Sequence, residues 1–130
     1  MSVTPLRFHR LWVTVGAVLI GVVVYLSLTP NPVEVPVAQG DKLGHGLAYA
    51  TLMYWFAQIH RAANLRALYA IAFVAMGIGL EFLQDLTDFR NFDVADMVAD
   101  ALGVGIGWAA APPRSPNVLM FIEAGLGGGK

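Results

Sequence analysis

Residues 81–100 read EFLQDLTDFRNFDVADMVAD, and this stretch separates two long apolar runs of the chain. It contains a single base, Arg90, and these acids: Glu81, Asp85, Asp88, Asp93, Asp96 and Asp100. Acidic side chains beside or inside an apolar medium are costly, so they pair with one another, with bases or with a ligand. The stretch therefore predicts a polar site where two apolar helices meet.

The composition indicates a membrane protein. Apolar residues make up 57% of the 130 residues and charged residues only 13%, whereas soluble domains average about 25% charged residues. The formal net charge of −1 gives no reason to expect nucleic acid as a partner, and the absence of cysteine excludes disulfides and thiolate metal sites.

The apolar runs predict an all-α membrane protein, a four-transmembrane-helix bundle that forms a single domain over residues 1–130. The predicted spans are residues 11–28, 43–59, 67–83 and 94–111, and the tail is residues 112–130. The first span exceeds the apolar region of about 7–15 residues found in signal peptides, so we expect it to be retained.

Local signals mark the ends of these helices. Pro30 and Pro112 stop the first and fourth helices, and Asp41 is expected to be the N-cap of the second. The apolar run 118–122 in the tail is too short to span a membrane and is expected to lie on its surface.

The distribution of bases predicts that both termini are cytoplasmic. The N-terminal segment, the second loop and the tail contain Arg7, Arg10, Arg61, Arg66, Arg114 and Lys130. The first and third loops have only Lys42 and Arg90 among the bases, so the positive-inside rule puts the acidic stretch at the outer face. This predicts a multi-pass membrane protein, with the lipid bilayer as its partner.

This topology brings three polar segments to one membrane level, namely the start of the second helix, the end of the third and the start of the fourth. Their candidate pocket residues are Asp41, Lys42, His45, Glu81, Gln84, Arg90, Asp93, Asp96 and Asp100. Asp93, Asp96 and Asp100 follow the spacing i, i+3, i+7 and so share one face of a helix.

Two bases, Lys42 and Arg90, do not neutralise these acids, so some carboxylates must be protonated, solvated or bound to a cation. A divalent cation is the cofactor that such a cluster would take. Its candidate ligands are His45, Glu81, Asp93 and Asp96. The competing interpretation is a network of ion pairs that fixes the register of the helices.

Two glycines of the fourth span, Gly103 and Gly107, form a G-x-x-x-G pattern. Small residues at this spacing let helix backbones approach closely. We expect these glycines to pack against another helix of the same chain.

The polar motifs together resemble the VanZ-like family of small membrane proteins. The resemblance covers residues 41–108 and rests on Asp41-Lys42-x-x-His45 with Tyr49, Glu81-x-x-Gln84, Arg90, Asp93-x-x-Asp96 and Asp100-Ala-Leu-Gly103. The fourth segment of that family often reads D-x-x-x-N-x-x-G, and here Asp100 stands at the Asn position. The resemblance implies an integral protein of the cell envelope, located in the bacterial inner or cytoplasmic membrane. The namesake of the family is linked to resistance to the glycopeptide antibiotic teicoplanin.

The expected function is the binding of a surface ligand, a lipid-linked envelope precursor or a cationic ligand in the outer acidic pocket. One alternative is an intramembrane, metal-assisted enzyme acting on a lipid or lipid-linked substrate. There Glu81 or Asp93 would be the base, His45 the acid or metal ligand, and Arg90 the phosphate-binding group. Another alternative is a proton- or cation-coupled transporter with Asp96 and Asp100 on the ion path.

Overall fold

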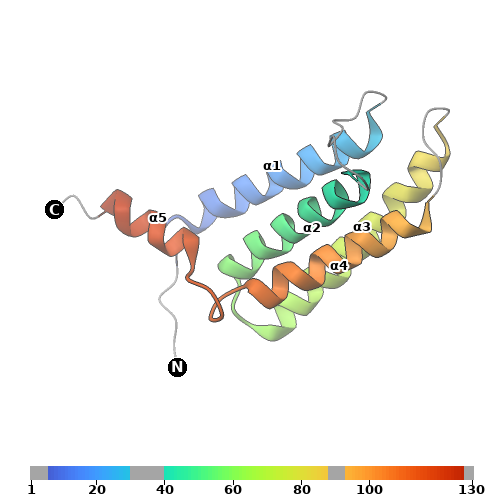
Figure 1. The fold of residues 1–130 in the computed structure, drawn as a ribbon. Helices are drawn as coiled ribbons and strands as arrows, with labels where there is room; N and C mark the ends of the chain where they lie inside the picture. The colour runs from blue at the N-terminus through green and yellow to red at the C-terminus, as the bar shows by residue number, and fades with distance from the viewer. Residues whose placement is uncertain (1–5, 30–39, 88–92, 128–130) are drawn as a thin grey trace.

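A computed structural model describes residues 6–29, 40–87 and 93–127, and for residues 40, 41 and 127 it describes the backbone alone. These parts of the chain form the helices α1 (His9–Leu28), α2 (Gly40–Ile59), α3 (Ala63–Asp85), α4 (Val94–Ala110) and α5 (Val118–Gly127). The four longer helices lie side by side, and α5 lies at one end of the group (Figure 1).

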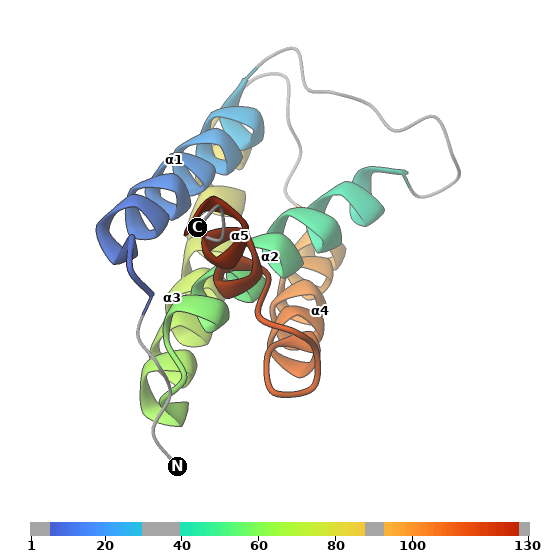
Figure 2. The same cartoon turned by 90° about the vertical axis from the view of Figure 1, so that its left-hand side faces the viewer.

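The second helix is the centre of the fold. α2 contacts each of the other four helices, and it lies between α1 and α4 (Figure 2). It supplies most of the buried side chains of the larger apolar cluster, among them Tyr49, Leu52, Met53 and Phe56, and Phe73 of α3 packs its ring against that of Phe56. Apolar residues on several faces of α2 therefore pack against other helices inside the protein.

The closest helix pair is α2 with α4, and glycine makes it possible. A Cβ atom at Gly103 would overlap the backbone carbonyl oxygen of Gly46, and one at Gly107 would overlap that of Ala50. Both neighbours are backbone atoms, which do not rotate away as a flexible side chain does. The G-x-x-x-G face of α4 thus lies directly against the backbone of α2.

The helices alternate in direction, so the two ends of the group differ in charge. We call one end, where α2 and α4 begin and α3 finishes, the acidic end; its described charged residues include Lys42, Glu81, Asp85, Asp93, Asp96 and Asp100. The opposite end, called the basic end, has Arg7, Arg10, Arg61, Arg66, Arg114 and Glu123.

The prediction of a four-transmembrane-helix bundle is wrong. Within the described residues two helices, α1 and α3, are long and apolar enough to cross a membrane. α4 has 17 residues and includes Asp96 and Asp100; at about 1.5 Å per residue it measures about 25 Å, less than a hydrocarbon core of about 30 Å. α2 has 20 residues, but it is less apolar because Asp41, Lys42 and His45 lie within it.

The helix boundaries also differ from those predicted. α2 begins at Gly40 and not at residue 43, so Asp41 lies in the first turn and is not the N-cap. α3 extends beyond the predicted residues 67–83 at both ends. The tail contains α5, and Leu119 of this helix is fully buried beside Trp12, so the tail packs onto the helices and does not simply lie on a surface.

Candidate functional site

The candidate site lies at the acidic end, between α2, α3 and α4. Lys42 and His45 lie in the first turns of α2, Glu81 in the last turns of α3, and the remaining acids at the start of α4. The structure brings together these predicted residues: Lys42, His45, Glu81, Asp93, Asp96 and Asp100. The side chain of Asp41 and the whole of Arg90 lie outside the described residues.

Lys42 joins α2 to the beginning of α4. Its Nζ lies 3.1 Å from Oδ2 of Asp93 and 3.4 Å from Oδ1 of Asp96. Asp93 is the N-cap of α4, where its Oδ1 accepts a hydrogen bond of 2.9 Å from the backbone N–H of Ala95. The bond to Lys42 and then the bond from Ala95 lower the pKa of Asp93, and the bond to Asp93 raises the pKa of Lys42 against the effect of burial.

His45 lies between two carboxylates. Its Nδ1 is 2.8 Å from Oδ1 of Asp100, and its Nε2 is 3.7 Å from Oδ2 of Asp96. Asp100 is only 2% exposed. The short contact with Asp100 and the longer one with Asp96 together fix the orientation of the imidazole ring.

Gly77 of α3 leaves the space that the side chain of Asp100 occupies. A Cβ atom at Gly77 would lie 2.7 Å from Oδ2 and 3.1 Å from Cβ of Asp100. The neighbouring Gly79 has nothing within 4 Å of the same added atom. Sequence analysis did not select Gly77, because a lone glycine in an apolar helix gives no signal that a carboxylate lies against it.

Glu81 is the most deeply buried acid of the site, with 1% of its surface exposed. Its Oε1 accepts a hydrogen bond of 2.6 Å from the backbone N–H of Asp93, which ties the end of α3 to the start of α4. Its Oε2 is buried, and the described residues provide no hydrogen-bond donor for it. A buried carboxylate oxygen without a donor is an exception that requires an explanation.

Gln84 has a different role from its predicted neighbours. Its Nε2 donates a hydrogen bond of 2.6 Å to the backbone carbonyl of Ser27, so it links α3 to α1 and not to the carboxylates. Gln84 therefore positions α1 beside the site.

The charge balance of the site is negative. Four carboxylates, those of Glu81, Asp93, Asp96 and Asp100, face one ammonium group and one imidazole. Among the described residues of the site acids outnumber bases even when His45 is counted as a base, and Asp96 and Glu81 are buried. The arrangement suits a guest that donates hydrogen bonds and carries positive charge.

For a metal ion, the geometry is less suitable. Across residues 6–29, 40–87 and 93–127, no three His, Cys, Asp or Glu side chains are grouped so that they could hold a metal ion. The candidate ligands His45, Glu81, Asp93 and Asp96 are instead engaged with Lys42, with Asp100 and with backbone groups.

A second polar group, which sequence analysis missed, fixes α5 at the basic end. Both carboxylate oxygens of Glu123 accept bonds of 2.8 Å from the backbone N–H groups of Arg7 and Phe8, and Oε2 accepts one of 2.6 Å from the indole of Trp12. Burial opposes the ionisation of Glu123, but these three bonds outweigh it and lower the pKa of its carboxyl. Gln58 of α2 accepts from the backbone N–H groups of Val118 and Leu119, at the start of α5.

Comparisons with known proteins are sparse. No family model matches the chain, and no solved structure matches it. The chain is similar to an uncharacterized protein, C11E3.10, of the fission yeast Schizosaccharomyces pombe, with 30% identity over 92 residues. The match covers 68% of this chain and 55% of the yeast protein, so the chain spans about half the length of the curated relative it matches. The resemblance to VanZ-like proteins therefore stays a prediction.

Proposed function

We propose that this chain is a membrane-embedded binding protein whose acidic end receives a primary ammonium group of a surface ligand, a lipid or a lipid-linked precursor. The observation that supports this most strongly is Oε2 of Glu81, a buried carboxylate oxygen with no donor among the described residues. An ammonium group would give this oxygen its missing donor and would offset the excess of negative charge around it.

The surface of the helices supports a membrane location. Large apolar side chains point outward along the candidate spans, including Val18 and Val22 of α1 and Ile71 of α3, which are 60%, 47% and 68% exposed. Apolar surface of this extent is typical of proteins that contact lipid or a partner. We propose that α1 and α3 cross the membrane in the same direction and that α2 returns the chain between them, which makes the protein multi-pass.

The resemblance to VanZ-like proteins adds the cellular setting to the proposal. Its motif positions Lys42, His45, Glu81, Asp93 and Asp96 are among the residues that lie together at the site. On this basis we propose a place in the bacterial inner or cytoplasmic membrane and a role in the cell envelope. A link to glycopeptide resistance would follow if the bound group belongs to an envelope precursor.

Three single-chain amphiphiles test the binding proposal. Dodecylamine offers charge and N–H donors, dodecyltrimethylammonium offers charge without donors, and dodecanol offers a donor without charge. Each is titrated into the purified protein in phosphatidylcholine nanodiscs, and the melting temperature and the intrinsic tryptophan fluorescence are followed. We expect dodecylamine to bind at least tenfold more tightly than either of the other two, because it alone supplies both properties.

Two variants show whether Glu81 is responsible. Glu81→Gln keeps an oxygen that can accept from the backbone of Asp93 but removes the charge, and it should lose the preference for dodecylamine. Asp85→Asn removes the same charge from an exposed residue one turn away, and this variant should keep the preference for dodecylamine. Equal binding of the three amphiphiles, or an unchanged preference in Glu81→Gln, would refute the proposal.

The hydrogen bond between His45 and Asp100 supports a second candidate, an enzyme that acts on a lipid or lipid-linked substrate. A carboxylate on Nδ1 orients an imidazole so that Nε2 can exchange a proton with a substrate. Phosphate release from phosphatidic acid in mixed micelles tests this candidate. Turnover that is lost in His45→Gln, while dodecylamine binding persists, would favour the enzyme; no turnover by the wild-type protein would count against it for this substrate class.

A further inference from the structure

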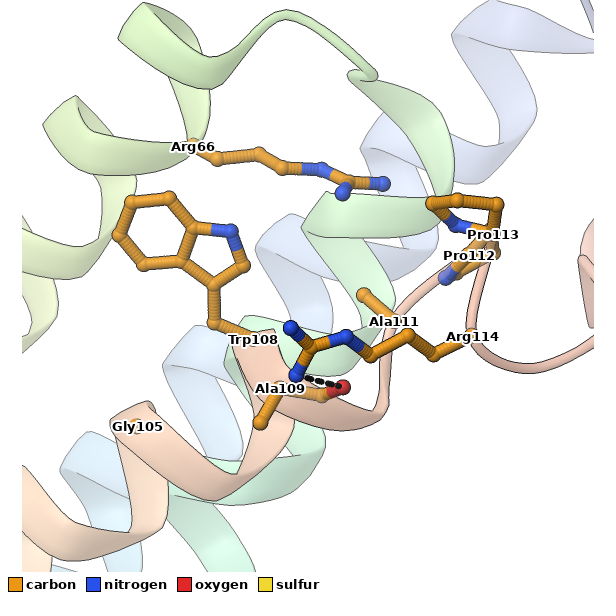
Figure 3. Close-up of a pocket in the computed structure, with 8 residues that line it drawn as sticks. All are labelled: Arg66, Gly105, Trp108, Ala109, Ala111, Pro112, Pro113 and Arg114. Atoms are coloured by element: carbon orange, nitrogen blue, oxygen red, sulfur yellow. Dashed lines mark hydrogen bonds between the residues drawn. The ribbon is translucent and has the colours of Figure 1, made fainter.

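A pocket of about 430 Å³ lies at the basic end, on the opposite side of the molecule from the acidic site. It is formed by the start of α3, the last turns of α4 and the segment that follows α4, and Figure 3 shows the residues that line it. They include Arg66, Trp108, Pro112 and Arg114, and no acidic residue is among them. Pockets of roughly 300–1,000 Å³ are of the size that binds small ligands.

Arg66 is the fixed cation of this pocket. It is only 7% exposed. Its Nε donates a bond of 2.8 Å to the carbonyl of His60, and its Nη2 donates one of 2.5 Å to the carbonyl of Ala57. These two bonds cap the end of α2 and hold the guanidinium in one position, and they leave Nη1 for a further acceptor.

Arg114 and Trp108 face the same space. Arg114 lies across the pocket from Arg66, and its Nη1 donates a long hydrogen bond of 3.5 Å to the carbonyl of Ala109 (Figure 3). The indole of Trp108 turns its nitrogen edge towards the space between the two guanidinium groups (Figure 3). A bound anion would therefore meet two guanidinium groups, those of Arg66 and Arg114, and one neutral hydrogen-bond donor, the indole N–H of Trp108.

We propose that this pocket binds a phosphate group, a monoester or diester, between Arg66 and Arg114. Guanidinium groups match the geometry of phosphate oxygens and bind them in pairs of hydrogen bonds. The basic end also has Arg7 and Arg61, whose charges add to the positive potential at this end. The phosphate can belong to a lipid headgroup or be free in solution.

The neighbouring surface favours a lipid as the source. Leu68 of α3 and Ile106 of α4 lie close in sequence to pocket residues, and they are 60% and 63% exposed. Acyl chains could lie along these side chains while the headgroup occupies the pocket, with Trp108 at the boundary between them. This proposal uses different residues from the acidic site, so either can fail without the other.

The test uses the full chain in neutral detergent micelles and three probes: inorganic phosphate, short-chain phosphatidylglycerol and short-chain phosphatidylcholine. Binding is measured by isothermal titration calorimetry. We expect phosphatidylglycerol to bind more tightly than phosphatidylcholine, which has a phosphate of the same kind but a cationic choline that the arginines repel. Phosphatidylglycerol binding with no binding of inorganic phosphate identifies a lipid site, and binding of both identifies a general phosphate site.

Two variants at exposed arginines complete the test. Arg114→Gln removes one wall of the pocket and should weaken phosphatidylglycerol binding about tenfold, as expected for one charge-assisted hydrogen bond. Arg10→Gln removes the same charge at the same end but outside the pocket lining, and should bind like the wild type. Equal losses in the two variants would mean general electrostatic attraction, and no loss in Arg114→Gln would mean that the pocket is not used; either result overturns the proposal.

Discussion

Replacing Gly103 with alanine should destabilise the protein through a single methyl group. The added Cβ would overlap the carbonyl oxygen of Gly46 and would lie 3.1 Å from the backbone nitrogen of Ala50. Because these are backbone atoms, relief requires that α4 move away from α2, and the displacement would loosen the tightest helix contact of the fold.

The size of the effect follows from two opposing contributions. Alanine is preferred to glycine in a helix by about 1 kcal/mol. Overpacking of a close contact costs about 1–3 kcal/mol, and a rigid backbone neighbour puts this case near the upper limit. We therefore expect a net loss of about 2 kcal/mol, which lowers the melting temperature by roughly 8 °C for a chain of this length.

Gly105 supplies the matched control within the same turn of α4. A Cβ atom there meets nothing within 4 Å, so Gly105→Ala gains helix preference without a clash. It should raise the melting temperature by roughly 4 °C. Thermal unfolding in detergent, followed by far-ultraviolet circular dichroism, measures both variants. Equal melting temperatures for Gly103→Ala and Gly105→Ala would show that α4 does not lie against α2 as described.

Three further predictions concern polar contacts. The ion pair of Lys42 and Asp93 stabilises the fold fully between the ordinary pKa values of 3.8 and 10.5, because pairing lowers the pKa of Asp93 and raises that of Lys42. This stability is lost as the pH falls through the lowered pKa or rises through the raised one. Asp93→Asn should therefore flatten the acid side of a plot of melting temperature against pH, and a curve parallel to the wild type would contradict the pairing. Glu123→Ala should cost about 2 kcal/mol by leaving its buried donors unpaired, and should speed tryptic cleavage between α4 and α5; unchanged cleavage would argue against its role. Gly77→Ala should displace the carboxylate beside it and alter the imidazole nitrogen shifts in NMR spectra, whereas Gly79→Ala should leave them unchanged.

The helices themselves could be predicted, because long apolar runs are interrupted by proline and by polar loops. Alternating direction then brings residues far apart in sequence to one end, which explains why Lys42, His45 and Asp96 could be expected to meet. The number of membrane-crossing helices could not be deduced in the same way. That number depends on the polar residues of α2 and on the length of α4. The prediction from sequence counted residues 94–111 as a span although Asp96 and Asp100 interrupt it.

Other features depend on neighbours that are distant in the chain. The orphan oxygen of Glu81 is defined by which donors surround it, and no local pattern encodes this. Glu123 directly follows the short apolar run 118–122, which was expected to lie on the membrane surface, yet its carboxylate accepts hydrogen bonds from backbone groups 115 and 116 residues earlier. From the sequence, Arg66 was one of several bases in a loop. In the structure it is buried and donates a hydrogen bond to the carbonyl of His60, directly after α2.

The contacts that hold α1 suggest an order of assembly. Its final turn is tied to α3 through Gln84 and Ser27, and its first turn is tied to α5 through Glu123. Among the described helices α1 comes before α2, α3 and α4 in the chain and α5 comes after them, so α1 can gain its contact with α5 only once all three intervening helices have been synthesised. The contact between Glu123 and the start of α1 therefore joins the two ends of the described helix order across everything that lies between them.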